Sequence, residues 1–296
     1  DAKVFEACFR EWISDLAGVV AGVVAIDGKT ACGSRDGRNT ALHTVSAYAT
    51  ASGLCLGQEH TRGKGHEIPA IKALLDTLAL KGCIVTIDAI GCQTEIARKI
   101  LDRGGDYLLA VKDNQKDLAD ALREFFADGE PRGFGSLPVS RFQSLEKAHG
   151  RIETRQAMWV TNLSWLDKKL REHWPKLAGL GMIERQREIN GAVSTERAYY
   201  IGSQGIKSAE SFAKAARDHW GIENSLHWVL DITFREDDCR VRKDHAPHNF
   251  AALRKFALTL LRQDTQYPKR SLRSRRKTAE RLPDYRASLL GLIPQS

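Results

Sequence analysis

The stretch Val23-Val24-Ala25-Ile26-Asp27-Gly28-Lys29 is an apolar, β-branched run that stops at a carboxylate followed by a glycine. Such a run predicts a buried strand that ends at Asp27. A second stretch, Cys83-Ile84-Val85-Thr86-Ile87-Asp88-Ala89, has the same form and ends at Asp88. Sites form at the carboxyl ends of strands in α/β sheets, so both aspartates are candidate functional residues.

Strand and helix patterns alternate around these two stretches. The first strand is followed by two more, at 42–49 and 54–61, and Ser52-Gly53 between them suits a hairpin turn. The remaining patterns are a helix at 68–80, a strand at 83–89, a helix at 94–102, a strand at 107–111 and a helix at 118–126. This order predicts an α/β protein with a mixed sheet flanked by helices. Three strands, a helix and a fourth strand, with Asp on the first and fourth strands, form a ribonuclease-H-like order.

The second half of the chain carries strand patterns and then helix patterns. Residues 128–150 are rich in Gly, Pro and charge and predict a linker, whereas 151–161, 181–189 and 196–202 alternate as strands do. We therefore expect a β-rich insertion that is separate from the core sheet. The predicted divisions are a remnant of a missing N-terminal domain at 1–20, a first part of the core at 21–128, the insertion at 129–204, a second part of the core at 205–262 and a basic C-terminal tail at 263–296.

Composition narrows the class of protein. The 296 residues carry a net charge of +8 and are 42% hydrophobic, which suits a globular protein with a polyanionic partner, most commonly nucleic acid. The six Cys form no CxxC pair, which argues against a zinc ribbon and favours a reducing, cytoplasmic setting. The longest uncharged apolar run, from Leu16 to Ile26, is too short to span a bilayer, so no membrane partner is expected.

A downstream stretch, His219–Asp231, predicts an apolar helix with one polar stripe. On an α-helix, residues four apart share a face, and four polar residues have this spacing: His219, Glu223, His227 and Asp231. Trp220 and Trp228 are expected in the core rather than stacked on bases, because such an apolar helix is typically buried. A buried carboxylate is costly unless it is paired or metal-bound. Glu223 is therefore either a metal ligand or part of a hydrogen-bond network with the two histidines.

Three carboxylates, Asp27, Asp88 and Glu223, suit hard divalent cations such as Mg²⁺ or Mn²⁺. Two such ions about 4 Å apart can activate a nucleophile and stabilise the leaving oxygen in phosphodiester chemistry. The alternative is that both aspartates cap turns after their strands. A zinc site on His219, Glu223 and His227 is not expected, because two His separated by two helical turns, about 12 Å, cannot share one ion.

Seven motifs occur in order through residues 20–262: Ala25–Thr30 (AIDGKT), Ile87–Gln93 (IDAIGCQ), Gly105–Gln115 (GDYLLAVKDNQ), His149–Glu153 (HGRIE), His219–Asn224 (HWGIEN), Leu226–Asp231 (LHWVLD) and Phe234–Asp238 (FREDD). In this set the chain resembles DDE transposases of the H-repeat-associated (ISAs-type) insertion-sequence family. Each motif alone is weak, but the ordered set is specific and covers most of the chain.

The resemblance implies a DDE-type transposase that cleaves DNA at insertion-sequence ends and transfers the strand to target DNA. It implies that Asp27, Asp88 and Glu223 form the catalytic triad and bind two Mg²⁺ or Mn²⁺ ions. It also implies a homodimer assembled on DNA and a bacterial cytoplasmic, nucleoid-associated setting. Related transposases often carry Tyr, Arg and Lys around the Glu, but this chain has His219 and Leu230 at two of those positions. Phosphate binding is therefore expected of other residues: Arg217, His219 or His227.

Further DNA contacts are expected from basic and amide side chains near the predicted site: Lys29, Lys112, Asn114, Gln115, Arg240, Arg242 and Lys243. The residues that follow the fifth strand, at 112–115, either contact phosphate, orient the metal site or cap a turn. The basic strip at 240–243 and the basic cluster at 269–277 either bind DNA or are simply solvated. The rival function is that of a catalytically inactive transposase remnant that binds DNA.

Overall fold

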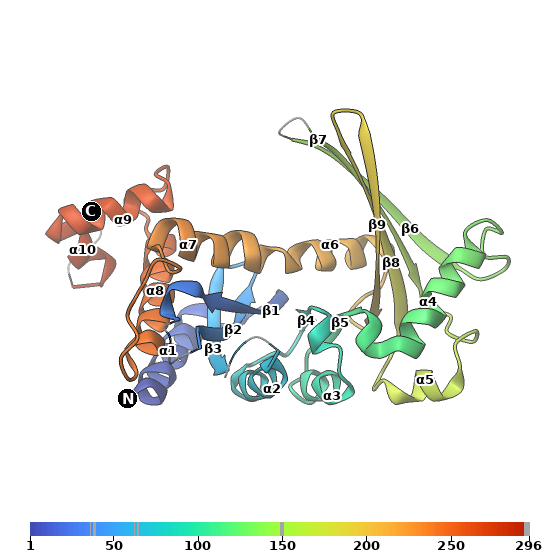
Figure 1. Cartoon of the computed structure of the whole chain (residues 1–296), viewed down its shortest axis with the longest axis horizontal. Coiled ribbons are helices and arrows are strands. Elements are labelled where there is room, and N and C mark those ends of the chain that lie inside the picture. Colours follow the sequence, from blue (N-terminus) through green and yellow to red (C-terminus); the bar gives the residue numbers. More distant parts are fainter. Residues whose placement is uncertain (36, 38–39, 62, 64, 149–150, 293–296) are drawn as a thin grey trace. The chain divides into compact units, whose positions relative to one another are not determined.

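A computed structural model describes residues 1–35, 37, 40–61, 63, 65–148 and 151–292 (Figure 1). The strands are β1 (Gly22–Ala31), β2 (Leu42–Ala49), β3 (Leu54–Thr61), β4 (Cys83–Ile87), β5 (Asp106–Val111), β6 (Val139–Ala148), β7 (Arg151–Val160), β8 (Gly179–Ile189) and β9 (Ala192–Gly202). The α-helices are α1 (Ala2–Ala17), α2 (Glu67–Thr77), α3 (Thr94–Asp102), α4 (Lys116–Gly129), α5 (Lys168–His173), α6 (Ala209–His219), α7 (Trp228–Phe234), α8 (Ala246–Gln263), α9 (Leu272–Arg281) and α10 (Pro283–Leu289). Within these ranges no helix is long and apolar enough to cross a membrane.

The predicted order of elements is confirmed from β1 to α4, and the fold is a mixed α/β sheet flanked by helices. The strand order is β3-β2-β1-β4-β5-β9-β8-β7-β6, which begins with the ribonuclease-H-like arrangement. Four shorter helical segments interrupt the pattern: η1 (Cys32–Ser34), η2 (Ala89–Gly91), η3 (Asp113–Gln115) and the π-helix η4 (Ile222–His227). One quoted motif is only partly visible, because His149 and Gly150 lie outside the described residues.

The chain divides into two compact units. The first unit contains residues 1–19, 27–77 and 221–296, and the second contains residues 20–26 and 78–220. In the second unit, β4 runs parallel to both β1 and β5, and β9 pairs antiparallel with β5. The antiparallel strands β6 to β9 then follow β5 in the sheet.

The strands of the predicted insertion therefore extend the sheet, and the prediction of a separate insertion is wrong. Register pairs from Leu108↔Gly202 to Val111↔Tyr199 supply the backbone hydrogen bonds that join β9 to β5. The predicted linker at 128–150 is also wrong, because it contains the end of α4 and the whole of strand β6. A charged surface strand such as β6 lacks the apolar run by which the core strands were recognised. The strands are thus part of the same sheet, whereas the functional division of the chain into a catalytic core and an inserted segment stays a prediction.

The core of the second unit forms where α6 packs on the sheet (Figure 1). The rings of Trp159 on β7 and Phe212 on α6 lie 4.9 Å apart, and both side chains are fully buried. A Cβ atom at Gly179 would lie 2.4 Å from the Trp159 ring, and one at Gly181 would lie 2.6 Å from it. The two glycines on β8 therefore make the room that this aromatic pair needs.

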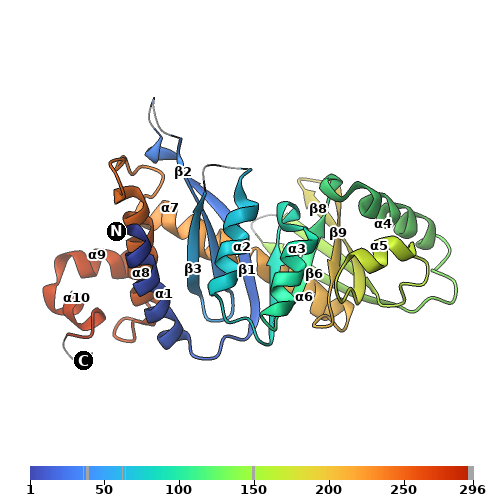
Figure 2. The same cartoon turned by 90° about the horizontal axis from the view of Figure 1, so that it is seen from below.

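In the first unit, β2 and β3 form the predicted antiparallel pair. Helices α1 and α8 pack on each other and on β3, and α2 packs on β2 and β3 (Figure 2). The buried faces are amphipathic, as expected: Phe9 and Ile13 of α1 and Leu74 of α2 are almost completely buried.

Residues 272–289 of the predicted basic tail form the two helices α9 and α10, separated by Leu282. Helices α9 and α10 enclose a small core of Leu261, Tyr285 and Leu289. Arg275 is buried and donates to the carbonyl oxygens of Leu261, Pro268 and Arg270 at 2.8–3.0 Å. One residue of the basic cluster thus has a structural role, which composition alone did not reveal.

Replacing Arg275 with Met should destabilise the protein by about 2–4 kcal/mol, because it leaves three carbonyls and the buried Asp264 without their cationic partner. Urea denaturation would measure the loss. The exposed Arg273 on the same helix is the control, and its replacement with Met should change stability by less than about 0.5 kcal/mol. Equal effects of the two substitutions would contradict the structural role of Arg275.

Candidate active site

Asp27 lies inside strand β1, directly after the fully buried segment 24–26. The prediction that the strand ends at Asp27 is wrong, because β2 neighbours β1 in the sheet and the strand continues to Ala31. The Gly28 N–H donates to Asp27 Oδ1 at 2.8 Å, and His227 Nδ1 lies 3.6 Å from Asp27 Oδ2. The carboxylate is thus oriented by its own strand and by a histidine of the π-helix.

A buried polar pair packs against the other face of β1. His43 Nε2 and Glu67 Oε1 are 2.6 Å apart, and Thr30 Oγ1 is 2.7 Å from His43 Nδ1. A Cβ atom at Gly28 would lie 2.6 Å from His43 Nε2 and 2.7 Å from Glu67 Oε1. Residue 28 must therefore be Gly for this pair to support the backbone beside Asp27. Sequence reasoning missed His43 and Glu67, although a glycine inside a strand pattern is a signal of close approach.

Asp88 follows strand β4 directly, as predicted. In the parallel pairing of the second unit, the last register pair of β1 and β4 is Ile26↔Ile87. Asp27 and Asp88 are the residues that directly follow Ile26 and Ile87 in the sequence. The turn after Asp88 is closed by the Gly91 N–H, which donates to the Asp88 carbonyl oxygen at 3.0 Å.

Asn114 and Gln115 hold the turn that follows Asp88. Asn114 Nδ2 donates to the Ala89 carbonyl oxygen at 2.7 Å, and Gln115 Nε2 donates to the Cys92 carbonyl oxygen at 2.9 Å. One bond reaches the first residue of η2, and the other reaches the residue directly after it. Among the alternatives for these two side chains, the structure favours orientation of the site over contact with DNA phosphate.

In the DNA cleavage that the resemblance implies, replacing Asn114 with Ala should lower nicking by about 10- to 100-fold, because the turn that carries Asp88 loses its side-chain bond. Nicking rates at saturating Mn²⁺ and DNA affinity by filter binding would test this. The exposed Lys116 is the matched control, and Lys116→Ala should leave the rate within about threefold. A fall in DNA affinity that accounts for the whole loss would instead assign Asn114 to phosphate contact.

Glu223 lies in η4, which separates α6 from α7. The prediction of an uninterrupted α-helix is wrong here, because a π-helix bonds residue i to i+5 and disrupts the four-residue spacing. Arg262 of α8 donates to the carbonyl oxygen of Ser225 within this segment, and also to that of Gly53. Such π-segments are rare overall, and those that occur often lie at functional sites. This favours a functional role for Glu223.

His219, at the end of α6, belongs to the second unit. Its Nδ1 forms a hydrogen bond with Thr86 Oγ1 on β4 at 2.9 Å, and burial lowers its pKa to about 4. The imidazole is therefore neutral at physiological pH. This placement favours a structural role in bracing β4, two residues before Asp88, over binding of DNA phosphate as a cation.

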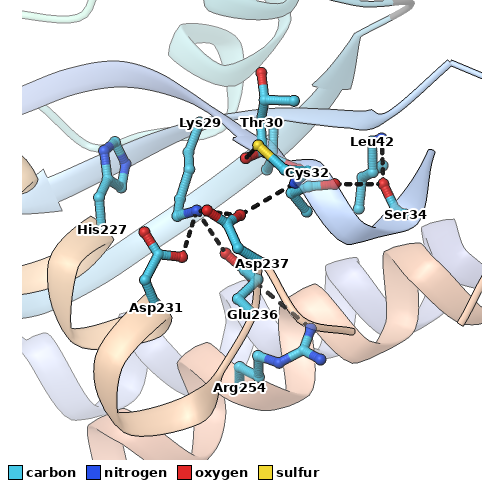
Figure 3. Close-up of polar contacts among 12 residues, drawn as sticks. Lys29, Thr30, Cys32, Ser34, Leu42, His227, Asp231, Glu236, Asp237 and Arg254 are labelled. Carbon is cyan, nitrogen blue, oxygen red and sulfur yellow. Dashed lines mark hydrogen bonds and ion pairs between the residues drawn. The ribbon is translucent and has the colours of Figure 1, made fainter. Parts of the chain in front are cut away.

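Lys29 follows Asp27 by two residues on β1, so both side chains point to the same face of the strand. Its Nζ contacts three carboxylates, those of Asp231, Glu236 and Asp237 (Figure 3). Burial by itself would lower the pKa of Lys29, but the bond to Asp231 and the neighbouring charges raise it above its ordinary value. The ammonium group is thus charged and engaged, an arrangement that disfavours the predicted contact with DNA.

The other predicted DNA contacts differ in their surroundings. Arg217 is paired with Glu146 at 2.8 Å, and Arg242 donates to the Gly33 carbonyl oxygen at 2.9 Å. Lys112, Arg240 and Lys243 are exposed. Exposure leaves these three as the better placed candidates for contacts with DNA.

Trp220 and Trp228 are 44% and 59% exposed, so the prediction that they lie in the core is wrong. The Arg185 guanidinium lies over the Trp220 ring, with its Cζ 5.9 Å from the ring centroid. The apolar core of this stretch is instead made by Ile222, Leu226 and Leu230. Base stacking, the alternative for the two indoles, is compatible with their exposure.

Three carboxylates are the donor set that Mg²⁺ and Mn²⁺ prefer, so the chemistry of Asp27, Asp88 and Glu223 fits such ions. Asp27 and Glu223 belong to the first unit and Asp88 to the second. In the part of the chain that the structure describes, no three His, Cys, Asp or Glu side chains are already grouped to hold a metal ion. Convergence of the three carboxylates stays a prediction.

The sheet begins with the ribonuclease-H-like strand order expected of a DDE-type transposase, and the family comparison agrees. The transposase DDE domain family matches residues 1–260, so the chain belongs to this family. It is 40% identical to the putative transposase YncI of Escherichia coli O157:H7, over 94% of this chain and 72% of that protein. It is 38% identical to the H repeat-associated putative transposase YhhI of E. coli K12, over 97% of this chain and 76% of that protein.

Among solved structures, the chain is similar to a piggyBac transposase synaptic complex with hairpin DNA. The TM-score is 0.46 at 10% identity, and the match covers 94% of this chain and 55% of that chain.

Proposed function

We propose that this transposase cleaves DNA at the ends of an insertion sequence and joins the freed strand to target DNA, with Asp27, Asp88 and Glu223 as its catalytic carboxylates. The observation that carries the proposal is the register of β1 and β4, in which Asp27 and Asp88 each follow the paired residues Ile26 and Ile87. The π-helix at Glu223 and the contact of His227 with Asp27 add support.

In this proposal the three carboxylates hold two Mg²⁺ or Mn²⁺ ions, which supply activation of the nucleophile and stabilisation of the leaving oxygen. Water attacks the phosphodiester at the element's end and releases a 3′-hydroxyl. That hydroxyl then attacks a phosphodiester of the target, and a 3′-oxygen of the target leaves. His227 braces Asp27, while Gly28 and the buried pair His43 and Glu67 maintain the backbone beneath it.

DNA is the proposed partner, both as transposon end and as target, and the active assembly is a homodimer on DNA. The net charge of +8 and the exposed Lys112, Arg240 and Lys243 supply sequence-independent attraction to phosphate. The affinity should therefore fall steeply as salt concentration rises. Residues 21–128 and 205–262 carry the catalytic core in this proposal.

The test is nicking of DNA that carries the element's own ends. We expect strand cleavage that leaves a 3′-hydroxyl, that requires Mg²⁺ or Mn²⁺, and that stops when EDTA removes the ion. Tight DNA binding without nicking in either metal would favour the rival function, an inactive remnant that binds DNA. Cleavage that is unaffected by EDTA would contradict the two-metal chemistry.

A further inference from the structure

The acidic motif Phe234–Asp238 has no role in the chemistry proposed above, yet two of its carboxylates, together with Asp231, converge on one largely buried lysine of the first unit. Lys29 Nζ lies 2.7 Å from Asp231 Oδ1, 3.2 Å from Asp237 Oδ1 and 3.6 Å from Glu236 Oε2 (Figure 3). The Lys29 side chain is only 11% exposed. Three carboxylates around one ammonium group form a counter-ion cluster rather than a surface ion pair.

The turn after α7 brings these carboxylates together. Arg235 adopts a left-handed conformation with φ of 54°, and the Glu236 N–H donates back to the Leu230 carbonyl oxygen at 3.1 Å. This reversal directs Glu236 and Asp237 toward the strand that contains Lys29. The Cys32 N–H donates to Asp237 Oδ1 at 3.1 Å, which attaches the turn to the chain just after β1.

A second cation completes the cluster from the other side. Arg254 of α8 lies 3.6 Å from Glu236 Oε1, and Glu236 is only 4% exposed. Lys29 and Arg254 thus hold the same buried carboxylate from β1 and from α8. Removal of Lys29 would leave Asp231 without its closest cation and Glu236 with Arg254, at 3.6 Å, as its remaining cation in this cluster.

The position of Lys29 connects this cluster to the candidate active site. Lys29 shares a strand face with Asp27, and its closest partner, Asp231, lies one helical turn after His227, which contacts Asp27. α7 also continues directly from the π-helix that contains Glu223. A tie between Lys29 and α7 therefore sets the position of that helix along β1.

We propose that Lys29 is a positioning residue, which holds α7 on β1 and so keeps Glu223 and His227 in place beside Asp27. The catalytic consequence rests on the proposed function, whereas the tie itself is a property of the fold. The alternative, a direct contact between Lys29 and DNA phosphate, requires the ammonium group to leave three carboxylates. In this proposal the motif Phe234–Asp238 supplies two of the carboxylates that pair with Lys29.

The experiment compares full-length Lys29→Met, Lys29→Arg and the milder Asp231→Asn with the unmodified protein. Lys29→Met should lower nicking by about 100-fold and raise the Mn²⁺ concentration for half-maximal nicking by about tenfold, with DNA affinity within about twofold. Lys29→Arg should recover part of the rate, because it keeps the cation. Asp231→Asn should shift the Mn²⁺ dependence in the same direction by a smaller factor. If Lys29→Met does not fold, this milder variant provides the test.

Hydrogen exchange of peptides covering residues 228–238 tests the tie without any activity. Lys29→Met should speed exchange there by at least about tenfold. Lys255→Met is the matched control, because Lys255 is another buried lysine of the first unit, paired with Gln58, and it should not speed exchange at 228–238. Unchanged exchange in Lys29→Met, or an equal change in Lys255→Met, would overturn the proposal.

Two further outcomes distinguish the structural role of Lys29 from a direct DNA contact and from the proposed function. Parallel loss of DNA affinity and nicking in Lys29→Met would assign Lys29 to phosphate contact and overturn the proposal. Faster exchange at 228–238 in a protein whose unmodified form does not nick DNA would support the tie and reject the proposed function instead.

Discussion

Replacing Asp27 or Asp88 with Asn is expected to lower metal-dependent nicking by at least about 1,000-fold, while DNA affinity stays within about twofold. Asn keeps the shape of the side chain but removes the negative charge that holds a divalent cation. DNA binding survives because phosphate recognition is spread over many Lys and Arg side chains. Nicking rates with Mn²⁺ and filter binding at fixed salt would measure the two effects.

Asp113→Asn is the matched control for these substitutions. Asp113 lies just after strand β5, as Asp88 lies just after β4, but it is exposed and paired with Arg123. This variant should nick at a rate within about threefold of the unmodified protein. Unchanged nicking in Asp27→Asn or Asp88→Asn would remove that residue from the mechanism. Equal losses of binding and cleavage would point to a structural role.

Glu223→Gln is expected to lower the nicking rate by a similar factor, at least about 1,000-fold, because it removes the third carboxylate of the proposed metal site. His227→Ala should have a smaller effect, about 10- to 100-fold, because His227 braces Asp27 at 3.6 Å and is not proposed as a metal ligand. The same nicking assay at increasing Mn²⁺ separates the two, since only Glu223→Gln should lose the response to metal.

A zinc site on the same helix predicts a different set of results. Purified protein would then contain one zinc ion per chain, and replacing either His219 or His227 would remove it. The spacing argues against this arrangement, because two His separated by two helical turns, about 12 Å, cannot bind the same ion. Metal analysis of the purified protein and of His219→Ala would decide the matter.

Local pattern was sufficient wherever a segment is buried on one or both faces. The runs Val23–Ile26 and Cys83–Ile87 form strands because β-branched residues favour extended backbone and are buried away from solvent in a compact fold. The helix predicted at 68–80 was recognisable from its apolar spacing alone, and it is α2 (Glu67–Thr77). The same periodicity failed for strand β6, whose residues are charged and partly exposed. It failed also for the basic segment at 272–289, whose small core depends on Tyr285 and Leu289 meeting Leu261.

The sequence by itself determined the order of elements from β1 to α4, the two candidate aspartates at the strands β1 and β4, and the family. Only tertiary structure decided which contacts each polar side chain makes. Lys29 meets Asp231, Glu236 and Asp237 more than 200 residues away along the chain, and Asn114 meets the carbonyl oxygen of Ala89, just after the neighbouring strand β4. The π-helix at Glu223 likewise occurs where Arg262, from a distant helix, binds the Ser225 carbonyl. Burial follows from local hydrophobic pattern, whereas hydrogen bonds and ion pairs depend on distances between segments that only the folded chain brings together.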